Sequence, residues 1–534
     1  MSADTPLRAG ALAEPDERGT LSADIVIIGS GMGGGTLAWA LRDSGLDVLL
    51  VERGGFLPRE PQNGDPREMF LRGRYRTSPS WTDAATGRPF QPGVYSWVGG
   101  NTKFYGACLP RFRAEDFGEL AHHDGVSPAW AFGYDELEPH YVTAERLYEV
   151  HGALGEDPTE PRHSAGYPRP PLAHEPVVER LAQSLRSQGL HPFHMANGMN
   201  LDTQAERVAD TASDGCPSES GAKSDTENRA IRPALEHENV RLLVDTEVTR
   251  LVTGADGTRV VAAEARRHGR ALRLEAKQFV VAAGAVNSAA LLLRSAADRH
   301  PDGLANSSGL VGRNYMVHNS TFFMGVGPGR NDTAWQKTLG MNDWYLAGPD
   351  TPFPLGNLQM LGKLHAAHVK KAKPWVPDWM LTMITDRSID LYLTTEDLPD
   401  PDNRITVDGD RITVHWKPNN LAPHREFVRR MSRAVRRAGY PLILTRRMGI
   451  ETNSHQCGTA VAGHDPATSV LDATCRSHDV GNLWLVDSSG FASSAALNPA
   501  LTIAANAIRV APHLAAAAGG TRAGASATDL QGES

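Results

Sequence analysis

Short apolar runs and one glycine-rich turn open the chain in an order that predicts an α/β sheet. Residues 25–28 are four consecutive apolar residues, as expected of a strand that is buried on both faces. After the glycine turn, residues 36–41 predict a helix that ends near Gly45. Residues 48–51 predict a second buried strand, which is followed by Glu52. Strand, glycine turn, helix, strand and acid in this order are typical of the first half of a doubly wound sheet.

Matching apolar runs recur far along the chain. Residues 279–284 predict another buried strand, and a helix follows over 287–294. Residues 483–487 predict one more strand, and residues 499–510 a last helix with Pro499 at its permitted first turn. We therefore expect the nucleotide-binding domain to be assembled from three separated pieces of chain.

The segments between these pieces have a different pattern. Residues 315–420 are rich in predicted strands, with the clearest hairpin over 404–414 around an Asp-Gly-Asp turn. Residues 424–437 predict a basic helix, which we interpret as a solvated face rather than a polyanion site. Residues 154–175 are Pro-rich and predict an extended surface connection. Residues 60–95 lack periodicity and predict a functional loop or lid.

Composition narrows the class of protein. The 534 residues carry 54 basic and 62 acidic side chains and a net charge of −8, which argues against a nucleic-acid partner. The sequence contains no run of 18 apolar residues that would predict a membrane span. The polar N-terminal residues lack a secretory signal, so we expect a soluble, cytoplasmic protein. The four cysteines form no Cys-x-x-Cys pair and predict reduced, buried thiols and no metal site.

The glycine turn fits a dinucleotide. Gly29 allows the tight turn, Gly31 lets the backbone approach a pyrophosphate, and Gly34 lets helix and strand pack closely. The helix N-terminus offers free N–H groups to phosphate, and Glu52 can accept hydrogen bonds from ribose hydroxyls. The alternative is a ligand-free βα turn. The motif does not separate FAD from NAD, but an N-terminal fingerprint with a distant closing strand is the arrangement of flavoproteins.

Four segments in order resemble the glucose–methanol–choline (GMC) oxidoreductase family across most of residues 22–515. The first is the glycine fingerprint. The second, residues 97–106, is similar to the family's flavin-contacting Gly-Gly loop, and the third, residues 281–288, to its second signature. The fourth is the pair of segments 453–459 and 486–502. The resemblance implies these cofactor-binding residues in addition to the fingerprint: Gly99, Gly100, Asn101, Thr102, Val248, Ala283, Gly284, Asp487 and Asn498.

The family implies a doubly wound, Rossmann-type FAD domain and an α+β substrate domain with an antiparallel sheet. We assign residues 22–112, 213–312 and 455–516 to the FAD domain and residues 113–212 and 313–454 to the substrate domain. We expect residues 1–21 to form a disordered arm and residues 517–534 a disordered tail, since both are rich in small and polar residues.

The resemblance also implies the chemistry. His455 would be the base that takes a hydroxyl proton, and Asn498 would hold the oxygen while hydride passes to flavin N5. Asn498 could instead cap the helix that begins at Pro499. Phe104 stands where some relatives attach FAD through a His, so we expect FAD to be bound non-covalently.

The His/Asn pair looks most like the pyranose-oxidase and bacterial glycoside-3-oxidase branch. This implies oxidation at C2 or C3 of a sugar or glycoside, with O2 or another compound as electron acceptor. Gln359 and Tyr105 are candidate substrate contacts, although Gln359 could equally lie on an exposed strand face. A sterol or other alcohol oxidoreductase, a flavin-containing lyase and a non-catalytic flavin protein are the alternatives, and a disulfide reductase is disfavoured because no Cys pair follows the first helix.

Overall fold

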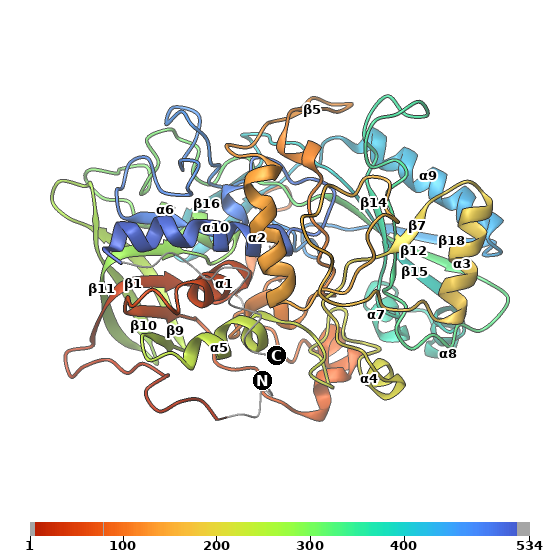
Figure 1. The fold of residues 1–534 in the computed structure, drawn as a ribbon, viewed down its shortest axis with the longest axis horizontal. Helices are drawn as coiled ribbons and strands as arrows, with labels where there is room; N and C mark the ends of the chain where they lie inside the picture. The colour runs from red at the N-terminus through yellow and green to blue at the C-terminus, as the bar shows by residue number, and fades with distance from the viewer. Residues whose placement is uncertain (1–5, 78, 521–534) are drawn as a thin grey trace.

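A computed structural model describes residues 6–77 and 79–520, and two sheets organise it (Figure 1). The first sheet is largely parallel and has seven strands in the order β8-β2-β1-β11-β10-β9, with β19 paired to β11. Its strands are β1 (Thr20–Ile28), β2 (Val48–Val51), β8 (Val240–Leu243), β9 (Thr246–Thr253), β10 (Val260–Arg267), β11 (Arg270–Val281) and β19 (Leu483–Leu485). The strands come from three regions of the chain, as the sequence predicted.

β11 joins the two kinds of pairing in this sheet. Along one side it pairs in parallel with β1, and along the other its first half pairs antiparallel with β10 and its last residues pair in parallel with β19. The ends of both strands are buried, as residues 279–281 of β11 and residue 28 of β1 show. Burial on both faces explains why each strand has an unbroken apolar run.

Two helices pack on this sheet and on each other, and a third helix packs on one of them. Helix α1 (Met32–Ala40) packs against α10 (Ala500–Ala518), and α10 packs against α2 (Tyr134–Leu147). Within the part of the chain that the structure describes, α10 alone is long and apolar enough to cross a membrane, but 67% of its apolar window is buried inside the protein, as in a core helix. Helix α6 (Ala285–Arg294) follows β11 as predicted.

The second sheet has six antiparallel strands in the order β18-β12-β15-β14-β13-β7. They are β7 (Pro192–His194), β12 (Asn319–Val326), β13 (Leu339–Met341), β14 (Asn357–Met360), β15 (Ser388–Thr395) and β18 (Leu442–Arg447). One face is apolar and packs on α9 (Leu421–Arg437) and α3 (Pro176–Ser187), for example through Phe323, Leu391 and Phe427. The opposite face carries polar side chains on β14 and β15 and the apolar Phe322 and Met324 on β12.

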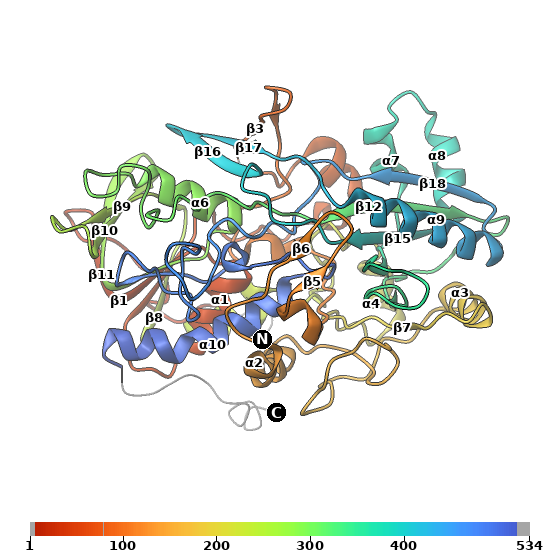
Figure 2. The same ribbon diagram turned by 90° about the horizontal axis from the view of Figure 1, so that it is seen from above.

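A small third sheet lies across α6. Its strands are β16 (Arg404–Asp408), β17 (Arg411–His415), β3 (Trp81–Asp83) and β4 (Pro89–Phe90), so the predicted hairpin is confirmed (Figure 2). Segment 60–95 thus supplies two short strands and two short helical turns, Pro61–Gly64 and Arg67–Arg72, rather than one continuous loop. The remaining elements are β5 (Leu120–Ala121), β6 (Val126–Ser127), α4 (Gln204–Ala209), α5 (Arg232–Leu235), α7 (Ala366–Ala372) and α8 (Asp378–Thr385).

Both chain ends are more ordered than the sequence predicted. Leu12 pairs with Leu242 of β8, and Ala11 and Ala13 are buried, so residues 7–21 are no disordered arm; short apolar residues let this segment lie along the sheet. At the other end, α10 continues through Ala518. The rest of the expected arm and tail, residues 1–5 and 521–534, lies outside the described residues. All four cysteines are free and buried, as predicted.

Candidate active site

The glycine turn forms an open cradle at the carboxyl end of β1. Gly29 has φ +103°, and a Cβ at Gly33 or Gly34 would overlap the carbonyl oxygen of Val486 or Gly29. A Cβ at Gly31, in contrast, would meet no atom within 4 Å. No side chain caps α1 and its first turn contains no acid, so its N-terminal amides remain available to an anion.

Glu52 is held in place at the end of β2. Its Oε2 accepts hydrogen bonds from the Ser30 N–H at 3.1 Å and the Ser30 hydroxyl at 2.5 Å, and its Oε1 accepts one from the Gly54 N–H. Burial raises the pKa of the Glu52 carboxyl. The Thr246 N–H bonds to the Glu52 carbonyl, which brings the start of β9, with the predicted contact Val248, beside this acid.

The predicted Gly-Gly loop lies directly against the cradle. Gly99 and Gly100 have φ of +93° and +55°, and a Cβ on Gly100 would stand 3.2 Å from the Gly31 Cα. The Gly99 N–H donates to the Ser30 hydroxyl at 3.1 Å. Loop residues are fixed from within, since the Asn101 amide bonds to the Tyr95 N–H and the Gly93 carbonyl, and the Thr102 hydroxyl donates to the Gly99 carbonyl.

Asp487 ties the ends of β11 and β19 together. Its Oδ2 accepts from the Gly284 N–H at 2.9 Å and from the Ser288 hydroxyl at 2.6 Å, while its Oδ1 caps Ser489. Gly284 has φ +83°, and the neighbouring Ala283 N–H donates to Ser288. The structure thus gathers the predicted cofactor residues along one edge of the parallel sheet.

His455 lies on a loop between the two sheets. Its Nδ1 is 3.3 Å from Nδ1 of His318, whose Nε2 is 2.9 Å from the Ser494 carbonyl oxygen. Burial, and next the neighbouring His318 and Lys337, lower the pKa of His455 to about 3. The imidazole is therefore neutral at physiological pH, in the form that can accept a proton.

Asn498 is held by a side chain of the second sheet. Its Oδ1 accepts a hydrogen bond from Gln359 Nε2 at 2.6 Å. Helix α10 begins with Pro499 in the capping position and without a side-chain cap, so Asn498 does not serve as the helix cap that the sequence allowed. Gln359 is fully buried rather than on an exposed strand face, and its Oε1 has no hydrogen-bond partner among the described residues.

One face of the second sheet brings His455 and Asn498 together. Tyr392 of β15 stands opposite Gln359 of β14 in the strand register. The Tyr392 ring meets the His455 ring edge-on with centroids 6.2 Å apart, while Gln359 bonds Asn498. Because directly opposed residues in an antiparallel pair have their Cβ atoms about 5 Å apart, the two predicted catalytic side chains lie over neighbouring positions of one polar face.

Tyr105 is placed between the loop and the core. Its hydroxyl donates to the Ser224 carbonyl at 2.5 Å, and burial raises the pKa of this phenol well above its usual value. The prediction that Tyr105 contacts a substrate stays a prediction.

Sequence reasoning missed several residues around His455. His318 precedes β12, and an ion pair joins Lys337 Nζ to Asp214 Oδ2 at 2.7 Å beside Gly106, where a Cβ would overlap both side chains. The charge of Asp214 and the hydrogen bond keep the pKa of Lys337 above its ordinary value despite burial. No sequence motif marks these residues, because they are far apart in the chain and come together only in the folded protein.

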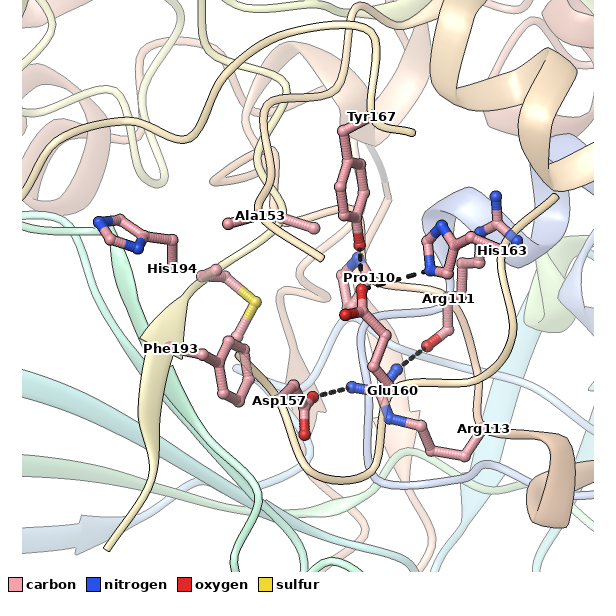
Figure 3. Close-up of a pocket in the computed structure, with 12 residues that line it drawn as sticks. Pro110, Arg111, Arg113, Ala153, Asp157, Glu160, His163, Tyr167, Phe193 and His194 are labelled. Carbon is pink, nitrogen blue, oxygen red and sulfur yellow. Dashed lines mark hydrogen bonds and ion pairs between the residues drawn. The ribbon is translucent and has the colours of Figure 1, made fainter. Parts of the chain in front are cut away.

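A small pocket lies further along the second sheet, with an empty volume of about 320 Å³. Figure 3 shows that its polar side chains point at one another: Arg113 pairs with Asp157, and Glu160 bonds Tyr167 and pairs with His163. Internally paired groups of this kind hold the fold together and leave little to recognise a ligand. Among the described residues, no group of His, Cys, Asp or Glu is placed to hold a metal.

The chain matches known families over much of its length. Residues 96–320 and 392–507 match the two family models described as GMC oxidoreductase, and residues 27–57 match an NAD(P)-binding Rossmann-like domain. The 6'''-hydroxyparomomycin C oxidase of Streptomyces lividus is 33% identical over 92% of each chain. The paromamine 6'-oxidase of Streptomyces fradiae is 32% identical over 92% of this chain and 91% of its own.

More distant proteins share the fold. The fructose dehydrogenase large subunit of Gluconobacter japonicus is 28% identical over 92% of this chain and 97% of its own. The crystal structure of pyridoxine 4-oxidase from Mesorbium loti superposes with a TM-score of 0.63 at 20% identity, covering 92% of this chain and 98% of its own. Both sheets therefore belong to one established architecture.

Proposed function

The chain belongs to the GMC oxidoreductase family and is an FAD-dependent enzyme, and from this premise we propose that it oxidises a hydroxyl group of a sugar-like alcohol. The observation that carries the proposal is the sheet face that holds a neutral His455 beside Asn498, whose amide nitrogen bonds to no described residue. The family supplies the reaction type, and the polarity of this face supplies the class of substrate.

The cradle fits FAD. The open space over Gly31 and the uncapped start of α1 suit a pyrophosphate, and the Gly99–Gly100 turn leaves no side chain between loop and cradle. We assign Glu52 to the ribose hydroxyls and Val248 to the adenine. When bound, FAD supplies the acceptor for a hydride. Phe104 is buried and stacked on Tyr95 with ring centroids 3.9 Å apart and has no nucleophile, which supports non-covalent binding.

His455 is the base. The Ser494 carbonyl can only accept, so His318 carries its proton on Nε2 and offers the lone pair of Nδ1. His455 must then donate from its own Nδ1, which leaves its Nε2 unprotonated. No described residue bonds to that Nε2, and this nitrogen takes the hydroxyl proton of the substrate.

Asn498 holds the substrate oxygen. Its Oδ1 is occupied by Gln359, so its Nδ2 remains as a donor. A neutral donor of this kind stabilises the negative charge that develops on the oxygen as the proton leaves.

The remaining polar groups suit a polyhydroxy substrate. Ser320, Tyr392, Thr394, Asn357 and Gln359 share the sheet face that turns away from α9. Gln359 Oε1 is buried and has no hydrogen-bond partner among the described residues, and we assign it as the acceptor for one further hydroxyl.

Two positions on the sugar compete. A secondary hydroxyl at C2 or C3 is our expectation from the His/Asn pair. Two relatives that are 33% and 32% identical are named for oxidation of 6'''-hydroxyparomomycin C and of the 6' position of paromamine. These names favour a second candidate, which is oxidation at a carbon numbered 6 on a sugar ring.

Anaerobic titration tests the proposal. We expect a panel of paromamine, fructose and methyl glycosides to bleach the flavin absorbance of the purified enzyme, and sterols to leave it unchanged. Product analysis by NMR assigns the oxidised carbon, and readmitted air shows whether O2 is the electron acceptor. A flavin that sterols alone bleach, or that no alcohol bleaches, would contradict the proposal, and the second result would favour a lyase.

A further inference from the structure

Side-chain amides behind Asn498 form a hydrogen-bonded chain. Gln359 Nε2, which bonds Asn498 Oδ1, also lies 3.3 Å from Asn357 Oδ1. Asn357 Nδ2 donates to Asn342 Oδ1 at 2.8 Å, and Asn342 Nδ2 donates to Asp157 Oδ2 at 2.7 Å. Every amide nitrogen in this chain faces an oxygen of the next residue.

Asp157, the last residue of this hydrogen-bonded series, fixes the orientation of every amide in it. Asp157 forms a buried ion pair with Arg113 at 2.5 Å, and an ionised carboxylate can only accept hydrogen bonds. Asn342 must therefore turn its nitrogen towards Asp157 and its oxygen towards Asn357. The same choice then passes through Asn357 to Gln359.

Burial makes the direction strict. Asn342, Asn357 and Gln359 are fully buried, with 0% of each side chain exposed. A single reversed amide would set oxygen against oxygen with no water to intervene, which leaves two buried polar groups unsatisfied. Surface amides, in contrast, turn over freely because water accepts either orientation.

We propose that the chain from Asp157 through Asn342, Asn357 and Gln359 is a positioning device that sets the orientation of the Asn498 amide, with Nδ2 towards the substrate. The inference rests on the proposed role of Asn498 as a donor. Gln359 acts through Asn498 and is in this respect a positioning residue. The Asp157–Arg113 pair that determines the orientation of Gln359 lies in the separate pocket of Figure 3.

Two substitutions of similar size test the device. Gln359→Glu replaces the donor at Nε2 with an acceptor, so Asn498 turns its nitrogen away from the substrate at neutral pH. We expect flavin reduction in that variant to slow by about 100-fold, the usual loss for one oxyanion donor. Gln359→Met removes the hydrogen bond without imposing the opposite orientation, and we expect a smaller loss.

The pH profile distinguishes orientation from general disruption. The oxygens of Asn357 and Asn498 flank the new carboxyl, and together with burial they raise its pKa. Below that pKa the carboxyl donates again, so flavin reduction in Gln359→Glu should recover as the pH falls. Its neighbours do not titrate in this range: the pKa of Tyr392 is raised to about 12, that of His455 lowered to about 3, that of Asp214 lowered and that of Lys337 raised.

The matched control is Gln278→Glu. Gln278 is also buried and hydrogen-bonded through its amide, but to Ala517 and Trp484, so its variant should show neither the loss nor the recovery. A loss in Gln359→Glu that is independent of pH and equal to that in Gln359→Met would overturn the inference.

Neutron crystallography of the protein reads the orientation without any substrate. We expect the amide hydrogens of Asn498 to point away from Gln359 in the wild type and towards residue 359 in Gln359→Glu at neutral pH. An Asn498 amide that is disordered or oriented alike in both proteins would reject the device. If the orientation is seen but no alcohol reduces the flavin, the proposed function fails and the positioning device stands.

Discussion

Among single residues, His455 shows most directly how its surroundings set the chemistry. Burial and the adjacent His318 lower the pKa of His455 to about 3, so its base form predominates at neutral pH. A neutral base of this kind is ready to accept a proton before the substrate arrives. What the surroundings control is which ring nitrogen of His455 carries its own proton.

His455→Ala tests the base itself. We expect flavin reduction to fall about 100- to 10,000-fold, the usual contribution of a general base, while FAD stays bound. Stopped-flow absorbance under anaerobic conditions measures the rate. His424→Ala is the matched control, since burial also lowers the pKa of His424 to about 4 but this residue bonds Thr321 and Thr395. Equal rates in wild type and His455→Ala would remove His455 from the mechanism.

His318→Gly tests the tautomer of His455. Position 318 has φ +68°, which glycine adopts without strain, and the substitution removes the acceptor of the His455 Nδ1 proton. We expect flavin reduction to slow about 10-fold or more and added imidazole to restore it.

The same variant should shift the pH profile. His318 is one cause of the low pKa of His455, so without His318 that pKa rises and the acid limb moves to higher pH. His268→Gly, at an exposed turn with φ +48°, controls for the backbone change. Failure of imidazole to rescue, together with an unmoved acid limb, would show that His318 only fills space.

Asp116 gives a prediction for stability against pH. Burial, and next the charge of Glu396, raise the pKa of Asp116 from 3.8 to about 7. Between these values the folded protein holds a proton that the unfolded chain releases, so the free energy of unfolding should decrease as the pH rises through this window. Asp116→Asn should flatten that dependence in urea denaturation, whereas Asp256→Asn, at an exposed turn, should leave it as in the wild type. A wild-type profile that rises over this window would contradict the assignment.

For the elements, the turn between β1 and α1 makes the clearest test of cofactor binding. A Cβ at Gly31 meets nothing in the protein, so Gly31→Ala should fold with unchanged thermal stability yet block the approach of a pyrophosphate. We expect the Kd for FAD, measured by isothermal titration of the apoprotein, to rise at least about 10-fold, since one 1.4 kcal/mol clash is enough.

Gly33→Ala is the contrasting variant of the same turn. Its Cβ would overlap the Val486 carbonyl, so this variant should lose folded stability as well as FAD. Gly166→Ala, where a Cβ also meets no atom, serves as the neutral control. Unchanged FAD affinity in Gly31→Ala would place the pyrophosphate elsewhere.

Elements with a strong local pattern were predictable from the sequence. The apolar runs of β1, β2 and β11 and the hairpin of β16 and β17 fall where the periodicity placed them, because each is decided by its own residues. Helices α7 and α8 were not predicted within the strand-rich segment 315–420, since each is eight residues long or shorter and carries little periodic signal.

The catalytic residues followed a different rule. His455 and Asn498 came from the family resemblance, and their roles stay predictions. Their partners His318 and Gln359 depend on contacts 137 and 139 residues away in sequence, which no local pattern encodes. The sequence named Gln359 as a substrate contact, but its bond to Asn498 could be seen only in the folded chain.

Across the whole molecule, the two sheets divide the work. The parallel sheet carries the cofactor cradle, and the polar face of the antiparallel sheet carries the partners of His455 and Asn498 (Figure 1). The boundaries of the two domains and the cytoplasmic location stay predictions. Limited proteolysis with and without FAD would examine the boundaries, since a bound cofactor protects the elements that contact it.

The pairing of β11 with β19 has a consequence for biosynthesis. Strand β19 and helix α10 emerge from the ribosome after almost all other elements, yet they complete the sheet on which the cradle is built. A nascent chain that has released β1, α1 and β11 still lacks the partner of the last residues of β11, and such open strand edges attract chaperones or other chains. We therefore expect FAD to bind only after translation is complete. The fraction of newly made protein that escapes aggregation should then depend on how much FAD is available at that stage.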